Sequence, residues 1–151
     1  MAKKIAIGAD HGGYELKEKI KTLLKKKGYS VEDVGGYSAE SCDYPEFGYA
    51  AAKMVSEKKA ARGIAICKSG IGMSMIANKV RGVRAALCVS VKDAVSSREH
   101  NDANVLVLGA GRTAPKKALE ITEAWLKTRA LKGRHSRRVK MIEKLERKEF
   151  R

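Results

Sequence analysis

The sequence lacks any apolar run close to the roughly 20 residues needed to cross a bilayer. Its first residues, MAKKIAIGADHGG, pass directly into a short strand-like stretch. They do not include the apolar core and small-residue cleavage site of a signal peptide. These two absences predict a cytoplasmic protein that does not associate with membranes. Hydrophobic residues make up 44% and charged residues 32% of the 151, as expected for one folded domain over residues 1–151.

Cysteines are too few and too scattered for a disulfide framework or a zinc site. Cys42, Cys67 and Cys88 are odd in number and form no C-x-x-C pair. We therefore predict three reduced thiols and no bound metal. The G-x-x-x-x-G-K-[ST] pattern of P-loop nucleotide-binding proteins is also absent.

Aromatic residues make up only 5% of the chain, and no basic segment carries the aromatics that stack on nucleic-acid bases. This scarcity matters because a net charge of +15 would otherwise favour a nucleic-acid partner. Residues 127–151 hold eleven Lys and Arg against three Glu, in a pattern typical of a solvated helix face. We interpret the charge as a soluble surface with an anion site and predict no nucleic-acid partner. The alternative, a nucleic-acid binder, requires an affinity that falls steeply with salt.

Strand-like and helix-like stretches alternate five times along the chain. Apolar runs predict strands at Lys4–Gly8, Tyr29–Val34, 63–66, Val83–Cys88 and Val105–Leu108. Helical patterns follow, in order, up to Gly28, at 46–58, from Gly72 through Lys79, and at 91–99, 115–128 and about 137–149. Continuous apolar strands that alternate with helices indicate a parallel sheet covered on both faces. The expected fold is a three-layer α/β/α sandwich.

Polar residues follow three of these strands. Asp10-His11 ends the first, Asp43-Tyr44-Pro45 lies in the loop after the second, and Cys67-Lys68-Ser69 ends the third. Ligands of such sheets bind at the carboxyl ends of the strands, near a topological switch point. We therefore expect these three clusters to lie near one another.

The segment Cys67–Gly72 carries the most information. A turn with glycines between a strand and a helix leaves several backbone N–H groups directed at one place, which favours an anion. A cysteine just before a helix N-terminus gains thiolate character. The structural alternative is a buried cysteine beside a packing turn.

Three further segments have a functional and a structural interpretation. Asp10-His11 is either an acid–base pair or part of a solvated loop. His100-Asn101, expected between a helix and a strand, is either functional or a helix C-cap. The segment Gly133–Arg138 either holds a phosphate through arginine or forms an exposed basic turn.

Six segments together resemble the type-B ribose-5-phosphate isomerases and the related galactose- and allose-6-phosphate isomerases. The matching runs are GADHGG (8–13), DYP (43–45), CKSGIGMSMIANK (67–79), GVRAALC (82–88), REHNDANVLVLG (98–109) and GRHSRRV (133–139). They occur in the family's order over nearly the whole chain.

The resemblance implies a Rossmann-like five-stranded parallel sheet and a C-terminal arm, about 130–151, that reaches a partner subunit. It implies a homodimer or tetramer with shared active sites, a sugar-phosphate substrate, and neither cofactor nor metal. Cys67 matches the base that moves a proton between C1 and C2, and Ser69 matches a residue beside that thiol. His100, helped by Asp10, matches the group that opens the furanose ring. The remaining expected contacts are the enediolate-stabilising backbone at Gly70, Ile71, Gly72 and Ser74, the phosphate-binding His11, Arg134 and Arg138, and the substrate-contacting Tyr44 and Asn101.

Two departures from the family pattern stand out. The residue after the matching cysteine is usually Gly and here is Lys68. The usual G-[SA]-R-V after the fifth strand appears as Gly109-Ala110-Gly111-Arg112, with the arginine displaced by one position.

The function implied by the resemblance is the interconversion of ribose 5-phosphate and ribulose 5-phosphate. Two alternatives stay open. A hexose-6-phosphate isomerase differs only by one carbon in its substrate, which a site rejects weakly. A non-catalytic sugar-phosphate sensor would keep Arg134, Arg138 and the glycine turn but would not need Cys67 together with His100.

Overall fold

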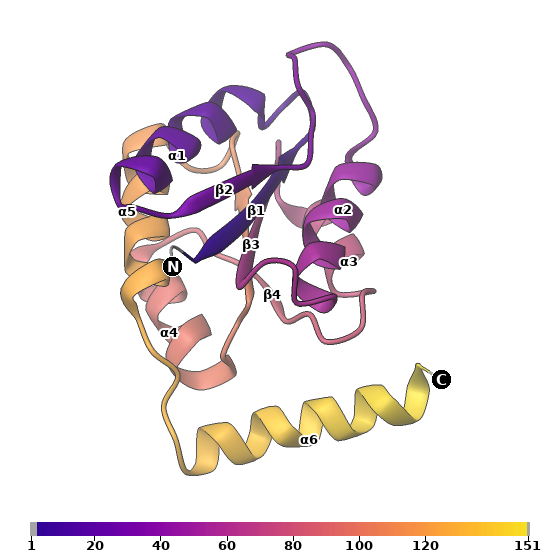
Figure 1. Ribbon diagram of the computed structural model, residues 1–151. Helices are drawn as coiled ribbons and strands as arrows, with labels where there is room; N and C mark the ends of the chain where they lie inside the picture. The colour runs from indigo at the N-terminus through magenta and orange to yellow at the C-terminus, as the bar shows by residue number, and fades with distance from the viewer. Residues whose placement is uncertain (1–2, 151) are drawn as a thin grey trace.

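A computed structural model describes residues 3–150 as five strands and six helices (Figure 1). The strands are β1 (Lys4–Ala9), β2 (Ser30–Asp33), β3 (Arg62–Cys67), β4 (Ala85–Leu87) and β5 (Val105–Gly109). The helices are α1 (Tyr14–Lys26), α2 (Tyr44–Ser56), α3 (Ile71–Ala77), α4 (Val91–Asn101), α5 (Pro115–Lys127) and α6 (Arg134–Glu149).

The five strands form one parallel sheet in the order β2-β1-β3-β5-β4. The three central strands are the apolar runs KIAIGA, RGIAIC and VLVLG, and almost every residue in them is buried. The edge strand β2, SVED, is partly exposed, because only one neighbour covers it. The residues of β2 alternate in exposure, whereas the central strands are apolar after Lys4 and Arg62, which begin β1 and β3.

Helices cover both faces of the sheet, which confirms the predicted α/β/α sandwich. Helices α1, α4 and α5 pack on one face, where Ile20, Ile121 and Trp125 meet Ile64 and other strand residues. Helices α2 and α3 pack on the other face, where the buried core includes Cys67 itself. Because β3 lies at the centre of the sheet, its carboxyl end reaches an edge surrounded by the loops that follow β1 and β5.

Several element ends differ from the sequence prediction, and two of the differences move site residues. Helix α4 continues through Asn101 and ends at Asp102, which adopts a left-handed conformation with φ of 45°. His100 and Asn101 are therefore in the last helical turn rather than between helix and strand, so that prediction was wrong. Helix α6 begins at Arg134, directly after Gly133 with φ of 71°, and not near 137.

Two other boundaries shift for local reasons. Helix α2 begins at Tyr44 rather than at 46, because Pro45 fits the first turn of a helix, where its missing N–H has no intrahelical partner. Strand β4 is shorter than 83–88. The N–H of Val83 is bonded to the carbonyl of Val80, and that of Arg84 to the side chain of Asn104, so neither N–H joins the sheet.

Helix α6 differs from the other five helices in its surroundings. It lies across the end of α4 and extends away from the sheet (Figure 1). Val139 is its only buried residue, whereas Met141, Ile142 and Leu145 are each about half exposed or more. No helix within residues 3–150 is long and apolar enough to span a membrane.

Candidate active site at the carboxyl edge of the sheet

Cys67 ends β3 with its thiol almost enclosed, at 5% exposure. Its Sγ accepts a hydrogen bond of 3.1 Å from the N–H of Gly70. Gly70 has φ of 79°, a left-handed conformation that lets the chain turn sharply from β3 into α3. A Cβ there would also lie 2.5 Å from Leu87, so the turn has no room for a side chain. The glycine thus directs one backbone donor at the sulfur of Cys67.

The first turn of α3 lies between Ser69 and Tyr44. The Ser69 hydroxyl accepts the N–H of Ile71 at 3.2 Å and so closes the turn on itself. The ring of Tyr44, at the start of α2, covers the backbone of Gly72, where a Cβ would lie 2.5 Å from the ring. Tyr44 is partly exposed, so its ring separates this turn from solvent on one side only.

Asp10 and His11 follow β1, beside the end of β3. The Asp10 side chain is buried, and its Oδ1 accepts the N–H of Gly13 at 3.1 Å. A Cβ at Gly12 would lie 3.3 Å from Asp10 and from Lys68, so the loops after β1 and β3 are in contact. The predicted convergence of these two clusters is confirmed.

The tautomer of His11 is set by the loop that precedes α2. The backbone N–H of Cys42 donates to His11 Nδ1 at 3.2 Å. A ring nitrogen that accepts a hydrogen bond carries no proton, so neutral His11 has its proton on Nε2. Nε2 is therefore available as a donor on an exposed side chain.

A buried lysine holds this loop in place, which the sequence analysis missed. Lys17 of α1 is fully buried and donates to Asp33 Oδ1 at 2.9 Å and to the carbonyl of Gly36. Lys21 donates to the other oxygen of Asp33 at 2.8 Å. Burial works against ionised Asp33, but hydrogen bonds from the lysines and the Gly35 N–H hold its pKa below the usual range.

His100 and Asn101 lie at the opposite edge of the sheet. Helix α4 runs antiparallel to the strands, so its last turn is beside Asn104, just before β5 begins. Each strand residue advances the chain by about 3.3 Å. The five residues of β5 therefore separate this edge from the end of β3 by about 15 Å. Cys67 and His100 of one chain are therefore not brought together.

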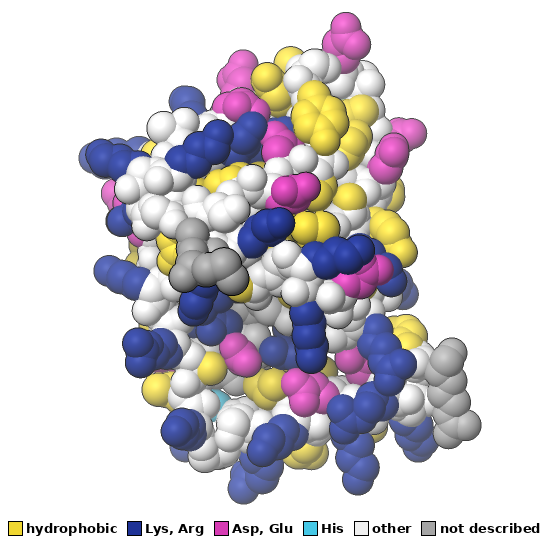
Figure 2. All heavy atoms as spheres, viewed as in Figure 1, with side chains coloured by type: hydrophobic (Ala, Val, Ile, Leu, Met, Phe, Trp, Pro, Cys, Tyr) yellow, Lys and Arg dark blue, Asp and Glu magenta, His cyan; other side chains and the backbone are white. Residues whose placement is uncertain are grey.

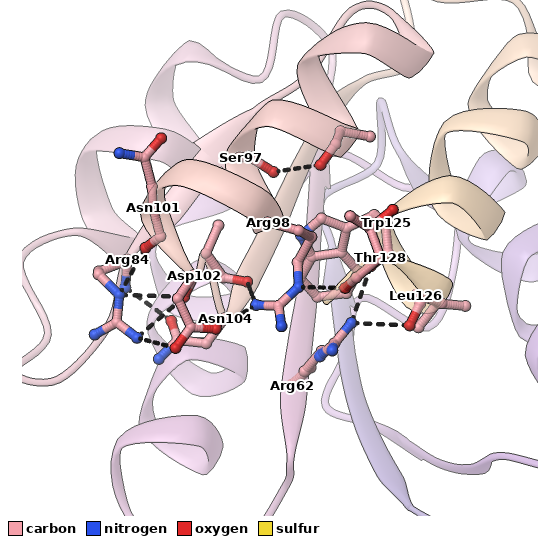
Figure 3. A network of polar contacts seen from close by, with 12 residues as sticks. Arg62, Arg84, Ser97, Arg98, Asn101, Asp102, Asn104, Trp125, Leu126 and Thr128 are labelled. Carbon is pink, nitrogen blue, oxygen red and sulfur yellow. Dashed lines mark hydrogen bonds and ion pairs between the residues drawn. The ribbon is translucent and has the colours of Figure 1, made fainter. Parts of the chain in front are cut away.

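Two arginines fix the end of α4, and a third lies beside them (Figure 3). Arg84 donates through Nε to the carbonyls of Asn101 and Asp102, each at 3.1 Å. Arg98 donates to Asp102 Oδ1 and to the carbonyl of Ala103, each at 2.7 Å. Beside them, Arg62 caps the carbonyls at the end of α5. Arg84 and Arg98 occur in the runs that resemble the isomerases, which was the available signal for them.

Helix α6 contacts α4 through two stacked histidines. The rings of His100 and His135 are 4.4 Å apart and tilted by 13°. The pKa of His135 is lowered mainly by partial desolvation and, to a smaller extent, by the nearby His100, Arg134 and Arg138. Arg134 and Arg138 are exposed on the same helix. Helix α6 runs along the lower edge of the molecule, where basic side chains gather (Figure 1 and Figure 2). The predicted site residues therefore form two groups, one at each edge of the sheet.

Neither group has the composition of a metal centre. Within the part of the chain that the structure describes, no three His, Cys, Asp or Glu side chains come close enough to hold a metal ion. The chemical resources of the carboxyl edge are a buried thiol, a buried carboxylate, an imidazole donor and backbone N–H groups. This set can move a proton on a small polar substrate and bind its anionic end.

Comparison with known proteins identifies these groups with one family. Residues 5–142 match the family model described as Ribose/Galactose Isomerase. Ribose-5-phosphate isomerase B of Escherichia coli K12 is 41% identical over 144 residues, which cover 95% of this chain and 97% of that protein.

Solved structures agree with the sequence comparison. The ribose-5-phosphate isomerase B of Clostridium thermocellum superposes with a TM-score of 0.94 at 50% identity, covering 96% of this chain and 98% of that one. The enzyme of Mycoplasma genitalium, solved with bound ribulose-5-phosphate, gives a TM-score of 0.93 at 40% identity, covering 97% and 98%. The fold, the motifs and both comparisons lead to one conclusion: the chain belongs to the ribose/galactose isomerase family.

Proposed function

We propose that this protein interconverts ribose 5-phosphate and ribulose 5-phosphate, with Cys67 as the base. The observation that carries the proposal is the enclosed Cys67 thiol with the Gly70 N–H directed at its sulfur. The relatives named above are ribose-5-phosphate isomerases B, and one was solved with ribulose-5-phosphate. The proposal includes two further expectations from the sequence, a cytoplasmic location and a role in pentose phosphate metabolism.

The reaction moves one proton between neighbouring carbons. The Cys67 thiolate takes the proton from C2 of the open-chain aldose, and the electron pair left behind forms the C1–C2 double bond of an enediolate. The thiol then returns the proton to C1 while a proton passes from O2 to O1, which gives the ketose. A base in position contributes roughly 10²–10⁴-fold to such a step.

The enediolate oxygen needs donors, and the turn at Gly70–Ser74 provides them. The N–H of Gly70 is directed at Cys67 and that of Ile71 at Ser69, while that of Ser74 is bonded to the carbonyl of Gly70. The first helical turn leaves its remaining N–H groups without intrahelical partners. We assign enediolate stabilisation to the N–H groups of Gly72 and Met73, at the turn that Tyr44 covers.

Ring opening needs an acid–base group near the sugar oxygen, and the proposal gives this role to His100 with Asp10. The two residues lie at opposite edges of the sheet in one chain, about 15 Å apart along the strands. A single chain therefore does not assemble Cys67, Asp10 and His100 around one sugar. A second copy can, because it presents its own α4 end to the carboxyl edge of the first.

The surface around α6 fits such a second copy. An apolar groove of about 470 Å³ lies between α6 and the β4 region and is lined by Val83, Ala85, Ile142, Leu145 and Phe150 among others. Exposed apolar side chains on a helix that extends from the fold favour burial against a partner. A twofold pair would also place each copy's Asn101 beside the other's Cys67. We therefore propose a homodimer, or a tetramer built from such dimers, with shared sites.

The phosphate is assigned to groups from both copies. His11 supplies an Nε2 donor at the carboxyl edge of one copy. Arg134 and Arg138 are four residues apart on α6 and therefore share a face of the helix, which the other copy contributes. Arginine suits this role because its fork of donors matches the phosphate oxygens.

The test is an isomerase assay on purified protein with ribose 5-phosphate, allose 6-phosphate and galactose 6-phosphate. We expect the highest kcat/KM with the pentose. A higher kcat/KM with either hexose phosphate would instead identify the protein as a hexose-6-phosphate isomerase of the same family. No turnover of any aldose phosphate, with binding retained, would instead favour a sugar-phosphate sensor.

A further inference from the structure

Lys68 follows Cys67 and lies in the crevice between the loops after β1 and β5. A Cβ at Gly12 would come within 3.3 Å of both the Lys68 Cβ and its backbone nitrogen. On the other side, the Gly111 N–H donates to the Lys68 carbonyl at 2.8 Å. The residue is exposed to solvent. Lys68 thus stands at the switch point where α/β sheets bind their ligands.

The side chain of Lys68 occupies the space next to Gly111. A Cβ built at Gly111 would lie 2.8 Å from Lys68 Cε and 2.9 Å from Cδ. The two positions at which the sequence departs from the family pattern are therefore in contact. Lys68 leaves little room for a side chain at 111, because its carbon chain crosses the place where such a side chain would begin.

The ammonium group of Lys68 has no carboxylate to neutralise it. Within residues 3–150, no Asp or Glu oxygen lies within 4.0 Å of its Nζ. The nearby Asp10 carboxylate is buried and accepts the N–H of Gly13. The exposed group on the same loop is the His11 imidazole, a second donor. A cation and an imidazole donor on adjoining loops are suited to an anion.

We propose that Lys68 binds the phosphate of the substrate, on the same side as His11. This inference rests on the proposed function and adds to it a binding residue particular to this chain. Lysine binds phosphate as a point charge and needs no fork geometry, so a flexible chain over Gly111 is sufficient.

The position of Lys68 favours the phosphate over the reacting carbons. Cys67 belongs to the core beneath α2 and α3, whereas Ile66 belongs to the core on the other face. Side chains alternate along a strand, so Lys68 continues on the Ile66 side. Its carbon chain then runs from Gly12 toward Gly111 and away from the thiol.

The first experiment compares Lys68→Met, Lys68→Arg and a control, Lys19→Met. Methionine keeps most of the carbon chain over Gly111 and removes the charge. Lys19 is exposed on α1 and has no part in the site, so its variant controls for the lost charge. We expect Lys68→Met to raise both KM for ribose 5-phosphate and Ki for inorganic phosphate about tenfold, as for the loss of one charge-assisted hydrogen bond. Lys68→Arg should stay within about threefold, and the control should be unchanged.

The second experiment uses the contact with Gly111. Gly111→Ala should push the lysine side chain aside and raise KM in the wild-type background. In the Lys68→Met background the same change should add little, because the phosphate contact is already lost.

Two outcomes would overturn the inference. One is a Ki for phosphate that Lys68→Met leaves unchanged. The other is a loss of kcat with no change in that Ki, which would place the ammonium near the reacting carbons. If the wild-type protein proves inactive, the proposed function fails, but an NMR titration of wild-type and Lys68→Met protein with inorganic phosphate still tests Lys68.

Discussion

The two edges of the sheet are built in different ways. At the carboxyl edge, Cys67 and Asp10 are buried, and glycines at 12, 70 and 109 bring neighbouring loops into backbone contact. At the opposite edge, His100 and Asn101 are exposed, on a helix end that Arg84 and Arg98 hold in place. These two side chains of the carboxyl edge are enclosed by their own chain, whereas the two at the opposite edge point into solvent. This difference is the basis for our proposal that proton transfer takes place at the carboxyl edge and that the opposite edge contributes His100 to the site of a second copy.

The largest expected effect follows from removing the thiol. Cys67→Ala should lower kcat by 10²-fold or more and leave sugar-phosphate binding within a few-fold, because affinity comes mainly from the phosphate. Cys88→Ala is the matched control, since burial raises the pKa of the Cys88 thiol to about 11 and keeps it neutral. Steady-state kinetics of both variants make the comparison. Retention of a tenth or more of the wild-type kcat by Cys67→Ala would remove this residue as the base.

The next largest effect is expected from an experiment that tests whether Cys67 of one copy and His100 of another form one active site. Cys67→Ala and His100→Asn should each be nearly inactive alone. After co-refolding, about half of randomly paired dimers are mixed, and each mixed dimer has one intact site of two. About a quarter of wild-type activity should therefore return. No recovery, despite heterodimers detected by mass spectrometry, would place both residues in one site of one chain.

A smaller effect is expected from the basic face of α6. Arg134→Ala and Arg138→Ala should each raise KM about tenfold and also lower kcat, because phosphate binding holds the reacting carbons in position. Arg147→Ala is the control, because thirteen residues after Arg134 that exposed side chain points to the opposite face of the same helix. Equal behaviour of the three variants would make α6 a solvated surface without a binding role.

The smallest effect on turnover is expected from the lysines that hold Asp33 near the carboxyl edge, because their loss acts on the stability of the fold. Lys17→Met removes a fully buried ammonium group, leaves the part-buried Asp33 carboxylate short of one partner, and should lower the free energy of unfolding by about 3 kcal/mol. Lys21→Met removes the more exposed partner of the same Asp33 and should cost about 1 kcal/mol. Urea denaturation measures the free energy of unfolding of both variants. An equal loss in the two would contradict the expectation that the buried lysine contributes more than the more exposed one.

The same pair has a pH dependence of known sign. The folded-state pKa of Asp33 is lowered, so its contribution to stability is present above its unfolded pKa of about 3.9 and is lost as pH falls below that value. Lys17→Met should show a shallower loss of stability on acidification than the wild-type protein. An unchanged pH profile of urea midpoints would count against this assignment.

The sequence predicted the sheet, the order of elements and the family, because these depend on patterns that are local in the chain. The central strands are continuous apolar runs apart from Lys4 and Arg62 at their starts, and the segment Cys67–Gly72 contains the two glycines of its turn. The family resemblance also supplied residue roles, and these stay proposals for Cys67 and His100 alike.

Contacts between distant residues were not predicted. Lys17 and Asp33 are 16 residues apart and look like ordinary surface charges until the fold pairs them. The predicted end of α4 was wrong because the helix ends on Asp102 in a left-handed conformation, and only a glycine at that position would have indicated such an end from the sequence. The contacts of Asp102 with arginine also cannot be inferred from sequence spacing. The contact between Lys68 and Gly111 likewise exists only once β3 and β5 are neighbours.

The burial of Cys67 also has a consequence for chemical damage. Oxidation of cysteine to sulfenic and higher acids follows thiolate character and access. A thiolate in an open cleft would be exposed to peroxide between turnovers, whereas Cys67 has only 5% of its surface accessible. Cys42, which is partly exposed, is the more accessible thiol at the same edge. Peroxide should therefore modify Cys42 before Cys67, so that oxidation of Cys42 leaves the proposed base intact.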